Sequence, residues 1–464
     1  MLHVAARFGH SELVTLLLQR GALKDLETRC KCQKSQAPEW DPGYTPLEYT
    51  CYGPSEACDS GSKQQSVPIE SVLRVIETLV DAGAERSRAA FKNAVLSGFG
   101  VEVLRPLSDK GAVDICVPEE YDKGPEEFHW EGREYGSKEC IADERATFLH
   151  MASVESNAAT VRGLLELGAD IHACDTLGRQ PLHWAVSRFQ RYWPLFGPDD
   201  VSAKLEVLQE MSAKVEVLLQ SGANPGRQDR FRRTPLHYAA LQMHTRLFEP
   251  LLRHGGSLTV TDEDGRSPLH LLADGQSYLI DNGRADWFDS AEELDVSGRE
   301  FATVLKPYST DIDQKDALGN TALHLAAGRA YASVLELLLA LGADPNIANP
   351  QGQTALHLAC DQQSRTWYDI IGPAGGPEPW ENETDRRHKR MRTLLIDAGV
   401  DQSIRDAQGR TAAEIEREEA SRISQMRQKC VDDFPERKKG WSWETLAEEY
   451  ESRHQSPSDW IMYR

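Results

Sequence analysis

Apolar residues along the chain recur in pairs of short blocks, and their spacing predicts pairs of helices. In one example Thr321 precedes an apolar block at 322–327, and a second block at 332–341 carries apolar residues at helical spacing. Threonine is a favoured helix N-cap, and Gly342 after the second block suits the left-handed conformation that often ends a helix. Turn residues such as 262–265 then lead into the next pair. One helix pair cannot bury both apolar faces alone, so the pattern predicts stacked copies.

A Leu-His pair marks the first block of most copies. Thr234-Pro235-Leu236-His237 and Thr321-Ala322-Leu323-His324 agree closely. A second landmark recurs downstream of the pairs, at Gly168-Ala169-Asp170, Gly222-Ala223-Asn224 and Gly342-Ala343-Asp344. The pairs stand at Leu2-His3, Leu149-His150, Leu182-His183, Leu236-His237, Leu269-His270, Leu323-His324 and Leu356-His357. These segments resemble the ankyrin repeat, with its 33-residue period and its T-P-L-H-x-A signature.

The resemblance implies an all-α fold, an ankyrin-repeat solenoid of about ten helix-turn-helix units with inter-repeat β-turn or hairpin loops. The array is expected over residues 1–430, and a Trp-containing tail over 431–464. Clear repeats are predicted near 1–25, 44–85, 147–178, 180–232, 234–265, 267–319, 321–352 and 354–409, with a degenerate repeat near 89–114 and a polar C-terminal cap at 411–430.

Alternate repeats carry long inserts. Leu182, Leu269 and Leu356 stand 87 residues apart, and the anchor leucines between them divide each period into steps of 54 and 33 residues. The extra residues are predicted between the two helices of alternate repeats, at about 188–213, 274–300 and 361–389. Each insert ends in a charged stretch that is expected to lengthen the second helix.

Composition narrows the class of protein. The chain has 464 residues, of which 40% are hydrophobic and 27% charged, as in a soluble folded protein. Its 73 acidic and 52 basic residues give a formal net charge of −21, which disfavours general nucleic-acid binding. Its apolar runs are too short to predict a membrane-spanning helix. Nine scattered cysteines favour reduced thiols in the cytoplasm or, as a second possibility, the nucleus.

The sequence contains none of the phosphate-binding, metalloprotease or nucleophile-elbow signatures, so neither an enzymatic activity nor a cofactor is predicted. In ankyrin-like units the histidine of the Leu-His pair is a structural hydrogen-bonding residue. That role is assigned to His150, His183, His237, His270, His324 and His357. A weak candidate for a zinc site is the group Cys30, Cys32, Cys51 and Cys58, whose spacing matches no familiar motif; ordinary loop cysteines are the alternative.

The resemblance also implies a binding surface, because proteins of this family bind partners through inter-repeat turns and the concave first-helix face. The turn candidates are Asp175, Thr176, Leu177, Arg230, Phe231, Arg232, Glu263, Ala317 and Gln351, and the first-helix candidates are Trp184 and Tyr238. Arg232 stands where sister turns have glycine, so a positive φ there carries a strain cost. The alternative is a variable, solvated turn.

Tryptophan is concentrated outside the repeat frame, and Trp193, Trp287 and Trp367 lie in the three inserts. They are interpreted either as partner contacts or as staples that fasten the inserts to their own helices.

The function predicted from these observations is that of a non-catalytic scaffold or adaptor that binds other proteins. A second hypothesis starts from Met1, which stands where the signature has proline, so the chain opens inside a repeat. On that hypothesis the array is the recognition arm of a larger enzyme or receptor, and the catalytic domain lies upstream of a truncated N-terminus.

Overall fold

The expected helix pairs are present in the computed structural model. It describes residues 1–29, 44–52, 67–108, 145–187, 201–241, 245–274, 298–308, 311–329, 331–361 and 383–433. These residues fall into two compact units. Unit 1 comprises Met1–Tyr238 with Pro250–Gly256, and unit 2 comprises Ala239–Glu249 with Ser257–Arg464.

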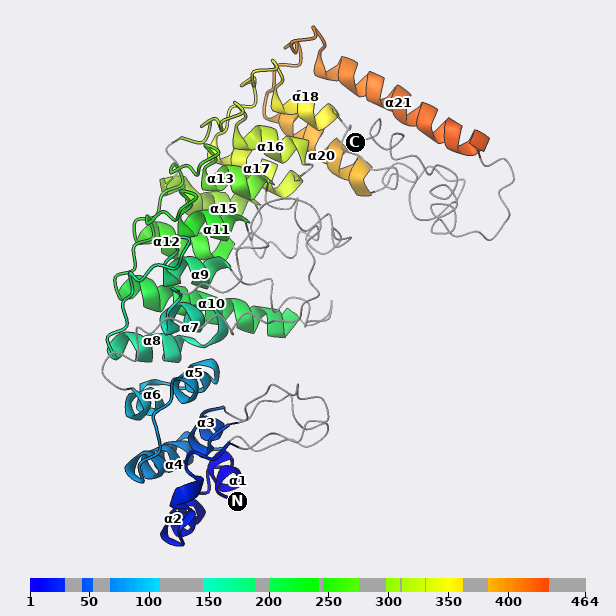
Figure 1. The fold of residues 1–464 in the computed structure, drawn as a ribbon. Helices are drawn as coiled ribbons and strands as arrows, with labels where there is room; N and C mark the ends of the chain where they lie inside the picture. The colour runs from blue at the N-terminus through cyan, green and yellow to red at the C-terminus, as the bar shows by residue number, and fades with distance from the viewer. Residues whose placement is uncertain are drawn as a thin grey trace. The chain divides into compact units, whose positions relative to one another are not determined.

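Unit 1 consists of first and second helices in alternation (Figure 1). The first helices are α1 (Leu2–Arg7), α3 (Pro46–Cys51), α5 (Arg88–Leu96), α7 (Phe148–Glu155) and α9 (Pro181–Ser187), and each packs on the next. The second helices are α2 (Ser11–Gln19), α4 (Ile69–Asp81), α6 (Val101–Leu107), α8 (Ala158–Glu166) and α10 (Val201–Gln220), and they form a parallel row of contacts. A short 3-10 helix, η1 (Ala22–Asp25), follows α2.

The division between the units falls within α11 (Pro235–Leu241) and α12 (Phe248–Arg253), which are joined by η6 (Thr245–Leu247). In unit 2, α13 (Pro268–Asp274), α16 (Ala322–Gly328), α18 (Ala355–Cys360) and α21 (Ala412–Asp433) pack in chain order. The second row consists of α15 (Gly298–Leu305), α17 (Ala332–Leu341) and α20 (Glu383–Asp397), and η8 (Lys306–Tyr308) follows α15. The described helices and their packing confirm the all-α solenoid.

The core of the stack consists of leucines and alanines on facing helices. The leucine of every Leu-His pair is at most 4% exposed. Thr147, Thr321 and Thr354 each accept a backbone N–H at a helix start while the histidine three residues later accepts the N–H of the threonine, which is a capping box built with histidine. At the other end, Gly342 closes α17 with a φ of 99°, as the sequence predicts.

Two of the three inserts lead into lengthened second helices. α10 has 20 residues and α20 has 15, against 9 in α8 and 10 in α17. For the insert at 274–300, the described helix α15 has 8 residues and is followed by the 3-10 helix η8, and the residues of the insert before Gly298 lie outside the described ranges. Pro307 lies within η8 and lacks the N–H that a continuing α-helix requires. The C-terminal helix α21 runs to Asp433, three residues past the predicted boundary of the array.

Candidate partner-binding surface

Buried histidines connect several first helices to the turn that follows the repeat. In His150, His183, His237, His270, His324 and His357, Nδ1 accepts the backbone N–H of the residue three positions earlier. Nε2 therefore carries the proton, and in five of them it donates to a carbonyl 29 to 53 residues away, as from His324 to Gln353 over 3.0 Å. Burial lowers the pKa of His150 and of His183 to about 4, so both are neutral at pH 7.

A carboxylate or amide forms the base of every described inter-repeat turn from Asp175 onward. One oxygen accepts the backbone N–H groups two and four residues later, as Asp175 Oδ1 does from Leu177 at 3.0 Å and Arg179 at 2.7 Å. The same pattern recurs at Asp229, Asp262, Asp316, Asn349 and Asp406. Asp175 was predicted as a partner contact, but it is only 2% exposed and its carboxylate holds the turn.

The second oxygen of the base residue accepts a side-chain donor in several turns. Asp175 Oδ2 accepts from Arg179 Nε at 2.6 Å and from Trp184 Nε1 at 2.8 Å, and Asp229 Oδ2 accepts from Tyr238 at 2.6 Å. Burial disfavours the charge of Asp175, yet Arg179 and the hydrogen bonds lower its pKa. Burial raises the pKa of Asp229, although the hydrogen bonds oppose the shift. The first-helix candidates Trp184 and Tyr238 thus bind the turns.

Neighbouring turns are also joined by backbone hydrogen bonds. The N–H of Arg230 donates to Leu177, that of Ala317 to Asp264, and that of Ala407 to Gln351, over 2.8, 3.0 and 2.8 Å. Each bond connects the two turns that flank an insert-bearing repeat. At the equivalent position of a plain repeat in unit 2 stands Pro350, which has no N–H to donate. The 87-residue period is therefore visible in the turns as well as in the inserts.

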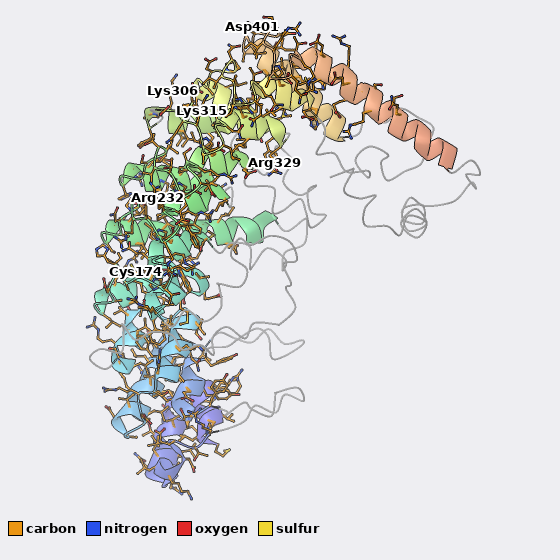
Figure 2. The ribbon with its side chains drawn as sticks, turned by 45° about the horizontal axis from the view of Figure 1, so that its top comes forward. Cys174, Arg232, Lys306, Lys315, Arg329 and Asp401 are labelled. Carbon is orange, nitrogen blue, oxygen red and sulfur yellow. The ribbon has the colours of Figure 1, made fainter. Side chains whose placement is uncertain are left out.

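The turn tips present the remaining turn candidates to solvent. Thr176, Arg230, Arg232, Glu263, Ala317 and Gln351 are exposed, Phe231 is half-buried and Leu177 is buried. Figure 2 places Arg232 on the turn-bearing edge of unit 1. Its φ of 60° is the one positive value for a non-glycine residue in the described ranges, which agrees with its place among sister glycines. The guanidinium of Arg233 lies 5.7 Å from the ring centroid of Phe231.

Two side chains of the lengthened helix α10 form a clamp, defined here as Lys214 and Glu210 bound to the facing ends of helices α7 and α8. Lys214 is 4% exposed and its Nζ donates to the carbonyl of Val154, at the end of α7, over 2.9 Å. One turn earlier, Glu210 accepts the N–H of Ala158 at the start of α8. Each charge complements the helix end that it binds. Burial lowers the pKa of Lys214 to about 8. Sequence reasoning missed this pair, although its i, i+4 spacing places both on one helix face.

A cavity of about 190 Å³ lies beside this clamp. Val154, Trp184, Met211 and Lys214 are among the residues that line it, and all of them belong to unit 1.

Several sequence candidates lie outside the described residues: Trp193, Trp287, Trp367, Cys30, Cys32 and Cys58. Cys51 is described, and its burial beside Glu48 raises the pKa of the thiol, which disfavours the thiolate that zinc requires. Within the described ranges no three His, Cys, Asp or Glu side chains are grouped so that they could hold a metal ion. Over the same ranges no helix is both long and apolar enough to cross a membrane.

Stacked helix pairs, linked by buried histidines and closed by aspartate-based turns, define a helical repeat protein. Family models describe the repeat directly: "Ankyrin repeats (3 copies)" matches residues 205–286 and 295–371, "Ankyrin repeats (many copies)" matches 149–189, and "Ankyrin repeat" matches 1–29. The chain belongs to the ankyrin-repeat family.

Similar proteins share this repeat. Mouse Rabankyrin-5 is 32% identical over 203 residues, which is 42% of this chain and 16% of that protein. Ankyrin repeat protein nuc-2 of Neurospora crassa is 26% identical over 306 residues, which is 63% of this chain and 24% of that protein. The chain thus spans less than a quarter of the length of these relatives. Among solved structures, the ankyrin repeat domain of Bcl-3 matches with a TM-score of 0.38 and 21% identity, covering 60% of this chain and 97% of that one.

Proposed function

We propose that this chain is a non-catalytic scaffold or adaptor that binds a partner protein through its inter-repeat turns and first-helix face. The observation that supports it best is the construction of the turns. Their base residues are hydrogen-bonded within the protein, whereas Thr176, Arg230, Arg232 and Glu263 are exposed at the tips. Side chains held on a rigid backbone lose little conformational entropy on binding, which favours recognition by the tips.

Within this surface we propose that the turn at 229–233 is an anchor for an acidic partner. Arg230 and Arg232 are exposed on either side of Phe231. Arginine next to an aromatic ring is enriched at the energetic centres of interfaces. The strained φ of Arg232 supports the same interpretation, since strain that persists at an exposed position is a feature of functional sites.

The test is affinity capture with the full chain, followed by quantitative mass spectrometry. The variant with Arg230→Glu and Arg232→Glu should lose the acidic partner, and association with the purified partner should become slower and less dependent on salt. The control variant carries Arg88→Glu and Arg162→Glu, which reverse two exposed arginines on helices α5 and α8. Equal capture by both variants would remove the turn at 229–233 from the proposed surface.

A further inference from the structure

The turn at 316–320 in unit 2 differs at its base from the turns that start at Asp175, Asp229 and Asp406. Asp316 is 7% exposed, and its Oδ1 accepts the N–H groups of Leu318 and Asn320 at 2.9 and 2.8 Å. Its Oδ2 is enclosed, and no donor from the described residues reaches it. A buried carboxylate oxygen without a donor is unfavourable, because the oxygen has lost its hydration.

Three sister turns supply that donor from two positions. The first is the residue four positions after the aspartate, from which Arg179 and Arg410 donate to Asp175 and Asp406. Arg266, at the same position after Asp262, binds Asp274 instead. The second lies nine positions after it on the first helix, where Trp184 and Tyr238 donate to Asp175 and Asp229. After Asp316 the two positions are Asn320 and Leu325, and neither side chain can supply a charged donor.

The cationic side chains of Lys315, Arg266 and Arg329 in unit 2 are engaged elsewhere. Lys315 donates from Nζ to the carbonyl of Ala348 at 3.0 Å. Arg266 and Arg329 both bind Asp274, at 3.1 and 2.9 Å. Figure 2 shows Lys315 on the turn-bearing edge of unit 2 and Arg329 on the opposite edge. An external cation would therefore find the carboxylate of Asp316 uncompensated by these residues.

The surroundings of Asp316 combine negative charge with an exposed apolar side chain. Leu318 at the tip is 65% exposed. The preceding turn, which is bonded to this one through Ala317 and Asp264, carries Glu263 at its tip. Leu325 is half-buried at the position from which Tyr238 reaches its aspartate.

We propose that the turn at 316–320 binds a partner segment that presents an arginine next to an apolar residue. The guanidinium displaces the side chain of Leu325 and donates to Asp316 Oδ2, as Arg179 and Arg410 donate to their own aspartates, at 2.6 Å and 2.9 Å. The apolar neighbour covers Leu318. This inference rests on the proposed function and names the chemistry of one partner site.

The test is a selection of displayed 12-residue peptides on the immobilised full chain. Arginine beside an apolar residue should be enriched among the retained peptides. A selected peptide should bind at least tenfold more weakly to the Asp316→Asn variant. That variant keeps the turn, because Asn349 makes the same backbone hydrogen bonds from the equivalent position. A charge-assisted bond is strong enough to produce an effect of this size.

A second variant, Leu325→Tyr, supplies the internal hydroxyl that Tyr238 supplies to Asp229, and it should abolish peptide binding while leaving the fold intact. The matched control is Leu358→Tyr, half-buried beside the turn that starts at Asn349, and it should bind as the wild type does. Peptides without arginine, or a selected peptide whose affinity for Asp316→Asn and Leu325→Tyr stays within twofold of wild type, would overturn the inference. Selected peptides that are lost only with Arg230→Glu and Arg232→Glu would overturn this inference and support the proposed function. A chain that retains no peptide and captures no protein would contradict both.

Discussion

The turn at 229–233 in unit 1 and the turn at 316–320 in unit 2 have the same backbone hydrogen bonds. They differ in whether a side chain donates to the second oxygen of the aspartate at the base. Asp229 and Asp316 each accept the N–H groups two and four residues later. The hydroxyl of Tyr238 donates to Asp229 Oδ2, whereas Asp316 Oδ2 is enclosed and has no donor among the described residues. Residues within the turn thus determine its backbone hydrogen bonds. A residue on the following helix decides whether the second carboxylate oxygen has an internal donor or can accept a hydrogen bond from a partner.

The two turns differ in strain as well. Arg232 adopts a φ of 60° where Gly319 adopts 80°. A Cβ on Gly319 would approach Pro350 Cγ to 2.5 Å, so glycine is required at 319 for space as well as for conformation. Arg232 is exposed, so the cost of a side chain at that position is the backbone strain of its positive φ.

The largest expected effect concerns acid, which should act on the buried histidines: His183 beneath the turn at 229–233, His270 beneath the turn at 316–320, and His150 beneath the turn at 175–179. The pKa of His150 and of His183 is about 4 when folded and 6.5 when unfolded, so the unfolded chain binds more protons between these values. Stability should be complete above pH 6.5 and fall as the pH drops towards 4, by roughly 2 kcal/mol for each histidine between pH 7.5 and 5. Burial lowers the pKa of His270, beneath the turn at 316–320, in the same direction.

Urea titrations at pH 7.5 and 5, read by hydrogen exchange of peptides from each turn, measure this effect. Equal protection at the two pH values would show that these histidines are not held neutral.

Replacement of the aspartate at the base should lower the free energy of unfolding more in the turn at 229–233 than in the turn at 316–320. Asp229→Ala leaves the N–H groups of Phe231 and Arg233 and the hydroxyl of Tyr238 without their acceptor, and should lower the free energy of unfolding by about 3–4 kcal/mol. Asp316→Ala leaves two N–H groups and should cost about 2 kcal/mol. Chemical denaturation of the two variants measures the difference, and an equal loss would mean that the bond from Tyr238 contributes nothing.

Substitution at the position that glycine occupies in most turns should change stability in opposite directions in the two turns. Arg232→Gly removes strain and should raise stability by about 1 kcal/mol. Gly319→Ala introduces both strain and the contact with Pro350, and should cost about 2 kcal/mol. Gly409→Ala is the control, since its φ is 79° and no atom lies within 4 Å of the added Cβ. Thermal unfolding should rank Gly319→Ala below Gly409→Ala, and the reverse order would contradict the role of Pro350.

The smallest expected effect comes from making the turn at 316–320 resemble the one at 229–233. Leu325→Tyr should raise the free energy of unfolding by about 1 kcal/mol through a bond to Asp316 Oδ2. Denaturant unfolding of the free chain measures this gain. A loss of stability would show that the pocket beside Asp316 does not admit a ring.

Much of the framework follows from local spacing. The Leu-His pairs predict the first helices, the capping threonines and the buried leucines, and the stacking of helix pairs is confirmed. The lengthening of α10 and α20 also follows from charged helical stretches at the ends of their inserts.

The sequence by itself determined the repeat, the positions of its caps and glycines, and which histidines face the next turn, because these depend on periods of a few residues and on intrinsic conformational preferences. Only the tertiary structure decided that Asp175 is buried, that Lys214 and Glu210 bind two helix ends, and that Asp316 lacks the side-chain donor that Asp175, Asp229 and Asp406 have. Lys214 and Val154 are 60 residues apart in the chain. Contacts of that kind arise when neighbouring repeats stack, and the stacking brings together side chains whose complementarity no local pattern encodes.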